Sequence, residues 1–363
     1  MKSIPIYRLN AVLLLIILTA VILYFGKTFL APLFFSMLLV MLLMPVCRKF
    51  EKWGIGRIWS TLIGILIIML FTAAFIGIIA AQAAAMAEDI PKMQSNAEQF
   101  LTNTQSWIQS RYGISPVEQI SYLKKGIGKA SQSGGQFFGA VLTGTFGLLT
   151  GFVLVLLYFF FLMWKREKYR SFILKLVKEE SRSEVSRELN QINSVAGKYL
   201  IGRMISMVFL AVFYMIGFSV VGLENGILVA LVAVVPTIVP YVGAFIGGFF
   251  PIALALVTGS SEMVVPVVII LVIAQVIDNN IIEPLAEGQS LGISPIWTIV
   301  AIVLGELVWG VAGMILFIPM FAIVKIICDH IPALSPYSFL LGNEVGQPQW
   351  VEKIRKAFTT KKK

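Results

Sequence analysis

The sequence PTIVPYVGAFIGGFFP, residues 236–251, lies within a long apolar stretch that proline and glycine interrupt repeatedly. From Met204 to Val324 there is no lysine or arginine. Charged groups at membrane depth cost about 2.5–3.5 kcal/mol each on insertion scales, so they persist where they face a cavity or have a function. Irregular backbone there is tolerated only inside protein or beside a water-filled path. The stretch nevertheless carries acidic residues: Glu224, Glu262, Asp278, Glu283, Glu287 and Glu306. This pattern predicts a translocation site for cations, protons or polar solutes.

The composition agrees with a membrane protein. Hydrophobic residues make up 58% of the 363 residues and charged residues only 13%, whereas soluble domains carry roughly 25% charged residues. We expect an all-α, polytopic integral membrane protein with about eight transmembrane helices. Its broken or re-entrant segments would lie near the C-terminal half. The net charge of +10 comes from bases beside the apolar spans, which the cytoplasmic bias of lysine and arginine explains better than nucleic-acid binding.

Residues 1–86 are predicted to hold transmembrane helices 1–3. The apolar runs 9–25 and 29–46 would form two spans joined by a tight hairpin at Gly26-Lys27, and a third would run over 60–85. A signal peptide fits less well, because no small-x-small cleavage site precedes Gly26. The loop 47–59 carries four bases and one acid, which places it, and the N-terminus, in the cytoplasm.

The middle of the chain alternates polar and apolar segments. Residues 87–136 predict a polar, amphipathic helical segment that packs on the bundle or on the membrane surface. A substrate-capturing or regulatory domain is the alternative for this segment. Residues 137–164 predict transmembrane helix 4. Residues 165–203 carry ten bases and five acids and predict cytoplasmic amphipathic helices, which could hold anionic lipid headgroups at about 1 kcal/mol per base.

Residues 204–328 are predicted to form the core transport region. A fifth span would cover 204–221, and 227–257 would be either one tilted, broken span or a re-entrant pair. Further spans are expected at 264–282 and 296–327, followed by a basic cytoplasmic tail, 329–363. Both termini in the cytoplasm require an even number of spans, and eight is the simplest number.

Two groups of polar residues could form the site. Asp278, Asn279, Asn280 and Glu283 supply hard oxygen ligands suited to a small cation or a hydroxyl-rich solute, although they could also be a polar rim at the membrane surface. Glu306 lies inside the last apolar stretch, where a buried carboxyl could couple transport to protons. The alternative is a structural hydrogen bond away from lipid.

Helix breaks could line the same path. Pro236, Pro240 and Pro319 release backbone carbonyls by interrupting the helical ladder, and such carbonyls line sites in many secondary transporters. They could equally be packing kinks. Gly305, Gly310 and Gly313 could also serve close helix contact.

Enzymatic function is not expected. His330 is the only histidine, and no zinc, nucleotide or catalytic-serine motif occurs. We therefore predict no cofactor and no metal site. Cys47 and Cys328 both fall on the predicted cytoplasmic side, where thiols stay reduced.

Three motifs resemble the AI-2E transporter family. They are Pro236-Thr-Ile-Val-Pro240-Tyr241-Val-Gly243 with Gly247-Gly248 and Pro251; Asp278-Asn-Asn-Ile-Ile-Glu283-Pro284 with Gly288, Leu291-Gly292 and Ser294-Pro295; and Gly305, Gly310, Gly313 and Pro319. The resemblance implies a bacterial inner-membrane permease of about eight spans, with a polar segment between the third and fourth. Members are described as exporters of the signal autoinducer-2, and some as sodium(lithium)/proton antiporters. Glu306 departs from the pattern and slightly favours ion coupling.

The leading hypothesis is a secondary transporter that exports a small polar solute such as autoinducer-2. The alternatives are a monovalent cation/proton antiporter and a non-transporting scaffold. The partners would be the solute or cation, protons and the lipid bilayer, with no nucleic acid; the sequence leaves room for a homo-oligomer. The expected pathway residues are Asp278, Asn279, Asn280, Glu283, Glu306 and Tyr241. The expected backbone breaks are Pro236, Pro240, Gly243, Gly247, Gly248, Pro251, Pro284, Gly305, Gly310, Gly313 and Pro319.

Overall fold

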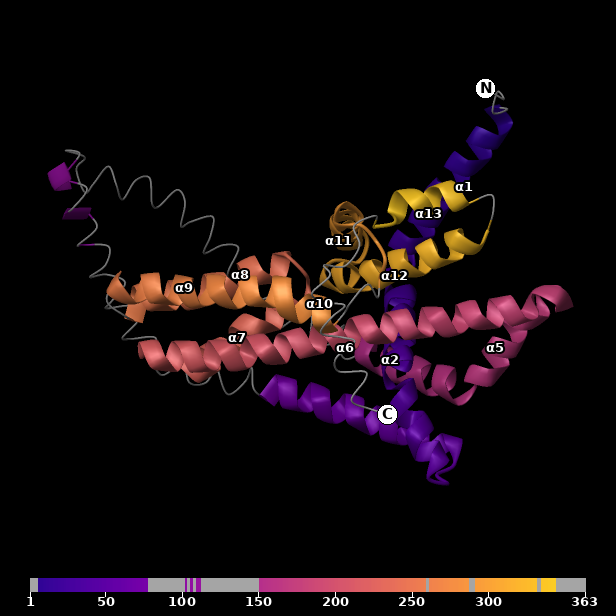
Figure 1. The fold of residues 1–363 in the computed structure, drawn as a ribbon, viewed down its shortest axis with the longest axis horizontal. Helices are drawn as coiled ribbons and strands as arrows, with labels where there is room; N and C mark the ends of the chain where they lie inside the picture. Colours follow the sequence, from indigo (N-terminus) through magenta and orange to yellow (C-terminus); the bar gives the residue numbers. More distant parts are fainter. Residues whose placement is uncertain are drawn as a thin grey trace. The chain divides into compact units, whose positions relative to one another are not determined.

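The protein is a helical membrane protein. A computed structural model describes residues 6–77, 102, 105–106, 109–111, 150–258, 261–286, 291–331 and 334–343. Over these residues it contains helices and no strand, apart from one isolated bridge between Ile293 and Gly342. Within the same ranges, five helices are long and apolar enough to cross a bilayer, and several shorter apolar ones accompany them. The predicted all-α, polytopic class is confirmed (Figure 1).

The chain folds as two compact units. Unit 1 comprises Met1–Met69, Gly151–Ser206 and Asn280–Lys363, and unit 2 comprises Leu70–Thr150 and Met207–Asn279. Most of the predicted amphipathic segment 87–136 and of the tail 329–363 falls outside the described residues. The proposed division of the chain into segments therefore stays a prediction.

The first two helices do not form the predicted hairpin. α1 (Ile6–Phe25) and α2 (Lys27–Lys52) are separated by Gly26 alone, which has φ −80° and ψ 4°. The Gly26 amide donates to the Ile22 carbonyl at 2.8 Å, and the Leu30 amide donates to the Gly26 carbonyl at 2.8 Å. The helical ladder continues through the glycine, so the expectation of a reversal at Gly26-Lys27 is wrong.

Unit 1 has a core of three helices. α2, the helix Arg57–Gly77 and the helix Thr150–Trp164 enclose a cluster of buried side chains. Reciprocal bonds join the first two helices, because Ser60 Oγ donates to the Cys47 carbonyl at 2.7 Å and Cys47 Sγ to the Ser60 carbonyl at 3.5 Å. The buried cluster consists of Val40, Leu43, Cys47, Ile68, Phe159 and Met163.

A long helix follows the fourth apolar run. α5 (Arg166–Lys175) and the 3-10 turn η1 (Glu179–Ser181) precede α6 (Arg182–Val221), which has 40 residues. α6 continues across the predicted boundary at 203/204 without a break. It ends in a Schellman motif: the Gly222 φ is +76°, Leu223 N donates to Phe218 O at 2.9 Å, and Gly222 N donates to Ser219 O at 3.1 Å.

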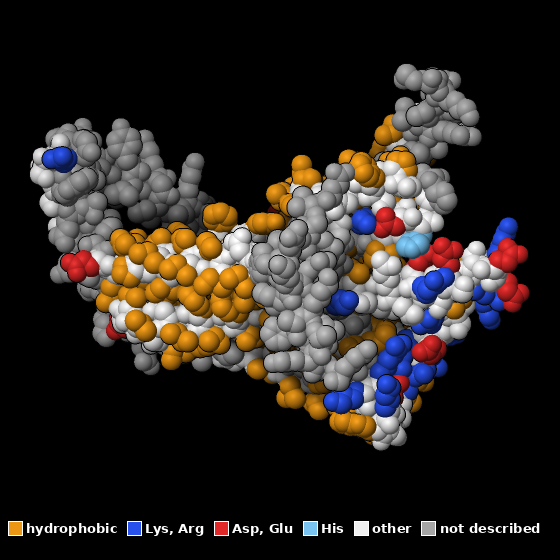
Figure 2. Space-filling model, viewed as in Figure 1, with side chains coloured by type: hydrophobic (Ala, Val, Ile, Leu, Met, Phe, Trp, Pro, Cys, Tyr) orange, Lys and Arg blue, Asp and Glu red, His pale blue; other side chains and the backbone are white. Residues whose placement is uncertain are grey.

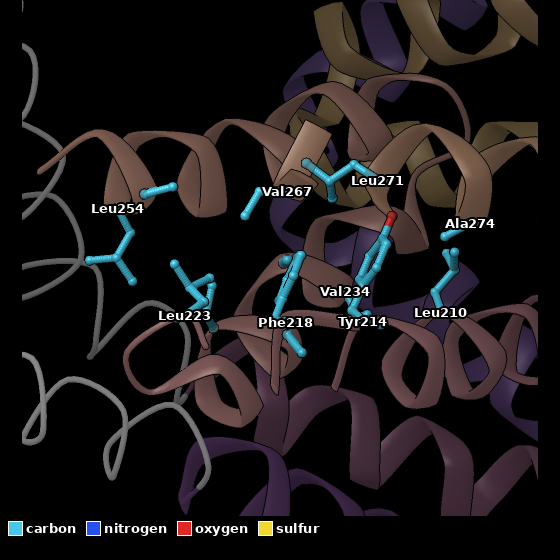
Figure 3. Close-up of a cluster of buried hydrophobic side chains, with 13 residues drawn as sticks. Leu210, Tyr214, Phe218, Leu223, Val234, Leu254, Val267, Leu271 and Ala274 are labelled. Atoms are coloured by element: carbon cyan, nitrogen blue, oxygen red, sulfur yellow. The ribbon is translucent and has the colours of Figure 1, made fainter. Parts of the chain in front are cut away.

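Unit 2 is built around the second half of α6. With it are α7 (Gly226–Val234), the 3-10 turn η2 (Val235–Ile238), α8 (Val242–Thr258) and α9 (Ser261–Ile277). Leu210, Tyr214 and Phe218 recur every four residues, so they share one face of α6, and all three are buried (Figure 3). Tyr214 and Phe218 stack with ring centroids 5.5 Å apart. Leu254, Val267 and Leu271 complete this core from α8 and α9.

In the described part of residues 278–343 there are five helical elements. They are the π-helical turn η3 (Asp278–Ile282), α10 (Glu283–Ala286), α11 (Pro295–Trp309), α12 (Val311–His330) and α13 (Ser335–Leu341). The prediction of one span over 296–327 is wrong. Gly310, with φ +61°, separates α11 from α12, and the chain folds back so that α12 packs on α11.

Candidate functional site

The proline-broken stretch after residue 226 folds as a helical hairpin. α7 and η2 pack against α8, so the folded-back alternative for 227–257 is the observed one. Close contact depends on glycine: a β-carbon on Gly243 would overlap the Pro236 carbonyl, and one on Gly247 would overlap the Ala233 carbonyl. Gly248 is less restricted, since its nearest neighbour, Leu271 Cδ1, lies 3.6 Å from such a β-carbon. We refer to this element, residues 226–258, as the first hairpin.

The tip of the first hairpin is an irregular turn. Pro236 and Pro240 have no amide hydrogen to donate, so the helical ladder cannot continue through them. Instead, the buried Thr237 hydroxyl donates to the Val234 carbonyl at 2.6 Å. Val242 N donates to Pro240 O at 2.7 Å, which encloses a γ-turn centred on Tyr241. Tyr241 has φ +61° and is 52% exposed, so this turn holds a strained, non-glycine residue, as functional sites often do.

Replacing Tyr241 by glycine tests whether that strain serves function. A left-handed conformation costs a non-glycine residue about 1–2 kcal/mol, so Tyr241→Gly should leave the turn intact and raise the melting temperature in detergent. If the ring contacts the solute, transport falls at the same time. Tyr241→Phe is the control, because it keeps both the strain and the ring. A lower melting temperature for Tyr241→Gly would contradict the strain argument.

Asp278 is the most buried acid of the predicted site. Its exposed fraction is 0%, and it begins η3, a π-helical turn directly before α10. Pro284 has no amide hydrogen for the carbonyl four or five residues earlier, which accounts for the widened helix at this point. Gln275 Nε2 donates to Asn279 Oδ1 at 3.3 Å, and Asp278 lies within electrostatic range of Tyr214 on α6. A π-turn is a frequent feature of functional sites.

α11 and α12 form the second hairpin, residues 295–330. A β-carbon on Gly305 would overlap the Gly313 carbonyl, and one on Gly313 would overlap the Gly305 carbonyl. The turn residue Gly310 has φ +61° and ψ −143°, a conformation essentially restricted to glycine. Trp309 fixes the turn end, since its Nε1 donates to the Leu23 carbonyl at 2.9 Å. Pro319 is buried within α12.

The expected burial of Glu306 is wrong. Its side chain is exposed, as are those of its neighbours Val303 and Leu307. Gly305 must face α12 to make the close backbone contact, so the next residue on α11 points away from that contact. Any role for Glu306 in the pathway stays a prediction.

The C-terminal helix α13 clamps the two ends of the second hairpin. Ser294 N donates to Leu341 O at 2.9 Å, and Trp297 Nε1 donates to Leu340 O at 2.7 Å, which fixes the start of α11. At the end of α12, Asp329 accepts from the buried Ser338 hydroxyl and pairs with Lys325 at 2.7 Å.

The predicted site residues divide between the two units. Tyr241, Asp278 and Asn279 belong to unit 2, together with the whole first hairpin and its breaks, Pro251 included. Asn280, Glu283 and Glu306 belong to unit 1, with Pro284 and the second hairpin. Asn279 and Asn280 are exposed, and Glu283 is half-buried. Among the described residues, no group of three or more His, Cys, Asp or Glu could hold a metal ion.

A buried polar stripe on α6 escaped the sequence analysis. Tyr199, Arg203 and Ser206 are only 2%, 6% and 0% exposed. Their spacing of four and three residues puts them on one helical face. A buried guanidinium is costly unless it is paired, so the protein around this face of α6 must satisfy Arg203. The spacing of these three residues is visible in the sequence, but the excess of bases in 165–203 suggested that Arg203 is the end of a solvated segment.

Comparison with known proteins identifies the family. The sequence profile of the AI-2E family transporters matches residues 13–333. The chain is 26% identical to "Putative transport protein YueF" of Bacillus subtilis over 82% of this chain and 84% of that protein. YrrI of the same organism, under the same description, is 26% identical over 84% and 87% of the two chains. PerM of Escherichia coli, named as a permease, is 23% identical over 89% and 94%.

The family match spans nearly all of the chain, including both hairpins and the Asp278 turn. The chain therefore belongs to the AI-2E transporter family.

Proposed function

We propose that this protein is a secondary transporter that exports a small polar solute such as autoinducer-2 across the bacterial inner membrane, with both termini in the cytoplasm. The observation that carries the proposal is the folding of both proline- and glycine-broken stretches into helical hairpins. Each hairpin is closed by glycine–backbone contacts and turns at an irregular tip. The substrate is taken from the family resemblance.

The hairpin tips suit a translocation path. Backbone that leaves the helical ladder within a bilayer must have its polar groups satisfied by protein or by a wet cavity. Discontinuous helices meet this condition in many secondary transporters, where they bind substrate and ions. In this proposal the Pro236–Gly243 turn of unit 2 supplies backbone groups to the path, and Asp278 and Asn279 of the same unit supply side-chain oxygens. In unit 1, the Gly310 turn, Asn280 and Glu283 are proposed as polar groups that meet the solute or ion.

A monovalent cation/proton antiporter is the second candidate. The fully buried carboxyl of Asp278 favours it, because a carboxylate at membrane depth can bind either a small cation or a proton. The same residues would serve both candidates, and flux measurements separate them.

The test uses the full chain reconstituted in liposomes. Synthetic autoinducer-2 is loaded inside, and its release is compared with that from protein-free liposomes and from liposomes carrying Gly243→Leu, which should force the first hairpin apart. We expect release that requires the wild-type protein and does not require sodium. Collapse of an imposed pH gradient by sodium, without solute flux, would instead support the antiporter. No flux of either kind would favour a scaffold and contradict the transporter.

A further inference from the structure

α5 carries an apolar stripe that no part of the described chain covers. Tyr169, Phe172, Ile173 and Leu176 are 44%, 61%, 37% and 71% exposed, and no residue of α5 is buried. Their spacing of three, one and three residues places all four on one helical face. Such a stripe of large side chains on a helix outside the apolar spans needs a partner.

Two arginines on the side of α5 next to Ile173 hold the helix in place. Arg166 pairs with Glu51 of α2 at 2.5 Å. Arg170 donates to Ser186 at 2.6 Å and to Asn190 at 3.0 Å, both on α6. These bonds fix how α5 is rotated about its axis, so the outward direction of the stripe is determined by the fold of unit 1.

Tryptophan marks the level at which α5 lies. Trp164 ends the apolar helix that leads into α5, and Lys165 Nζ lies 3.8 Å from its ring centroid. Trp53 ends α2 beside Glu51 and is 65% exposed. Tryptophan concentrates at the boundary between headgroups and acyl chains, and the Arg166–Glu51 pair attaches α5 to this same end of α2.

Lysines border the stripe. Lys168 and Lys175 lie four residues before and three residues after Phe172, so they flank it on the helix. Lys165 lies just before α5 and Lys178 just after it, and all four lysines are exposed. The only acid on α5, Glu167, lies 3.6 Å from Arg166. Figure 2 shows this concentration of basic side chains, with apolar ones among them, where Figure 1 places α5.

We infer that α5 is an interfacial helix that binds anionic phospholipid, with its apolar stripe inserted at the headgroup level and Lys168 and Lys175 contacting phosphate. Apolar insertion bordered by bases is the pattern of helices that lie in an anionic membrane surface. The cores of protein–protein interfaces, by contrast, are depleted in lysine, so a protein partner fits this surface less well. The inference does not depend on the transported solute.

The experiment measures the depth of single labels in nanodiscs. A bimane label is placed at Phe172→Cys, and at Ser171→Cys as the matched control, because Ser171 is exposed on the far side of α5. Cys47 and Cys328 are buried, and protein without an introduced cysteine is treated identically as the blank. Nanodiscs contain phosphatidylcholine alone or an equal mixture with phosphatidylglycerol, with a spin-labelled lipid as quencher.

We expect severalfold stronger quenching at position 172 than at 171, increased further by phosphatidylglycerol. In Lys168→Gln/Lys175→Gln, the phosphatidylglycerol-dependent part should fall, because each base near an anionic surface contributes about a fivefold preference. The Ser171 label in this variant verifies that α5 remains folded. Equal quenching at both positions would overturn the inference. A label at 172 that is shielded from water but not quenched would also overturn the inference, and it would identify a protein partner. Quenching that does not depend on phosphatidylglycerol would overturn it as well.

Discussion

Gly305→Val and Gly313→Val should each prevent the second hairpin from closing and abolish transport. A β-carbon at either position overlaps the carbonyl of the other glycine, so the two backbones must separate and release the contacts around Gly310. Overpacking of this kind costs about 3 kcal/mol, a large part of the roughly 5–15 kcal/mol that stabilises a typical fold. The measurements are the yield of monodisperse protein, its melting temperature in detergent and solute flux in liposomes.

Gly151→Ala is the matched control for these two variants. Gly151 is helical, and a β-carbon there meets no atom within 4 Å. Replacing glycine by alanine inside a helix gains about 0.5–1 kcal/mol, so this variant should match or exceed the wild type in melting temperature. If Gly305→Val had the stability and flux of the wild type, the two helices of the second hairpin would not need their close backbone contact, and the prediction would be contradicted.

Asp278→Asn should reduce transport about 10- to 100-fold, because a hydrogen bond to a charged group is worth about 1.5–3 kcal/mol. The asparagine keeps the size of the side chain and its ability to form hydrogen bonds, but it can neither carry the charge nor exchange a proton. The buried position of Asp278 in η3 makes the charge the main difference between the two proteins. The measurement is initial flux over a range of pH.

Glu262→Gln is the control on the same helical segment. Glu262 is exposed in the first turn of α9, so its loss should change flux little. If the melting temperature of Asp278→Asn is close to that of the wild type, the substitution affects transport rather than folding. If Asp278→Asn and Glu262→Gln carried solute equally well, Asp278 would not belong to the pathway.

The fold class followed from the sequence because membranes impose simple rules. The scarcity of charge, the base-free stretch and the long apolar runs each require helices, since a bilayer leaves no other way to satisfy backbone polar groups apart from closed barrels. The irregularity near Pro236 and Pro240 could also be predicted, because proline cannot donate to the helical ladder.

Other features depended on packing that the sequence does not express locally. Nothing in residues 296–327 distinguishes a single kinked span from a hairpin until Gly305 and Gly313 are seen in contact. The exposed position of Glu306 follows from that contact alone. At Gly26 the opposite error arose: a glycine–lysine pair suggested a turn, but its backbone stayed helical. Arg203 was overlooked because a count of charges does not report which helical face is buried.

The clamp made by α13 gives the second hairpin an unusual mechanical property. The helices meet at Gly305 and Gly313 near the turn, and Trp297 and Asp329 are tied to one short helix at the other end. The element is thus a closed ring, in which neither arm can fray or swing alone. During a transport cycle the second hairpin and α13 must therefore move together as one rigid body, and any bending must occur in the chain outside them.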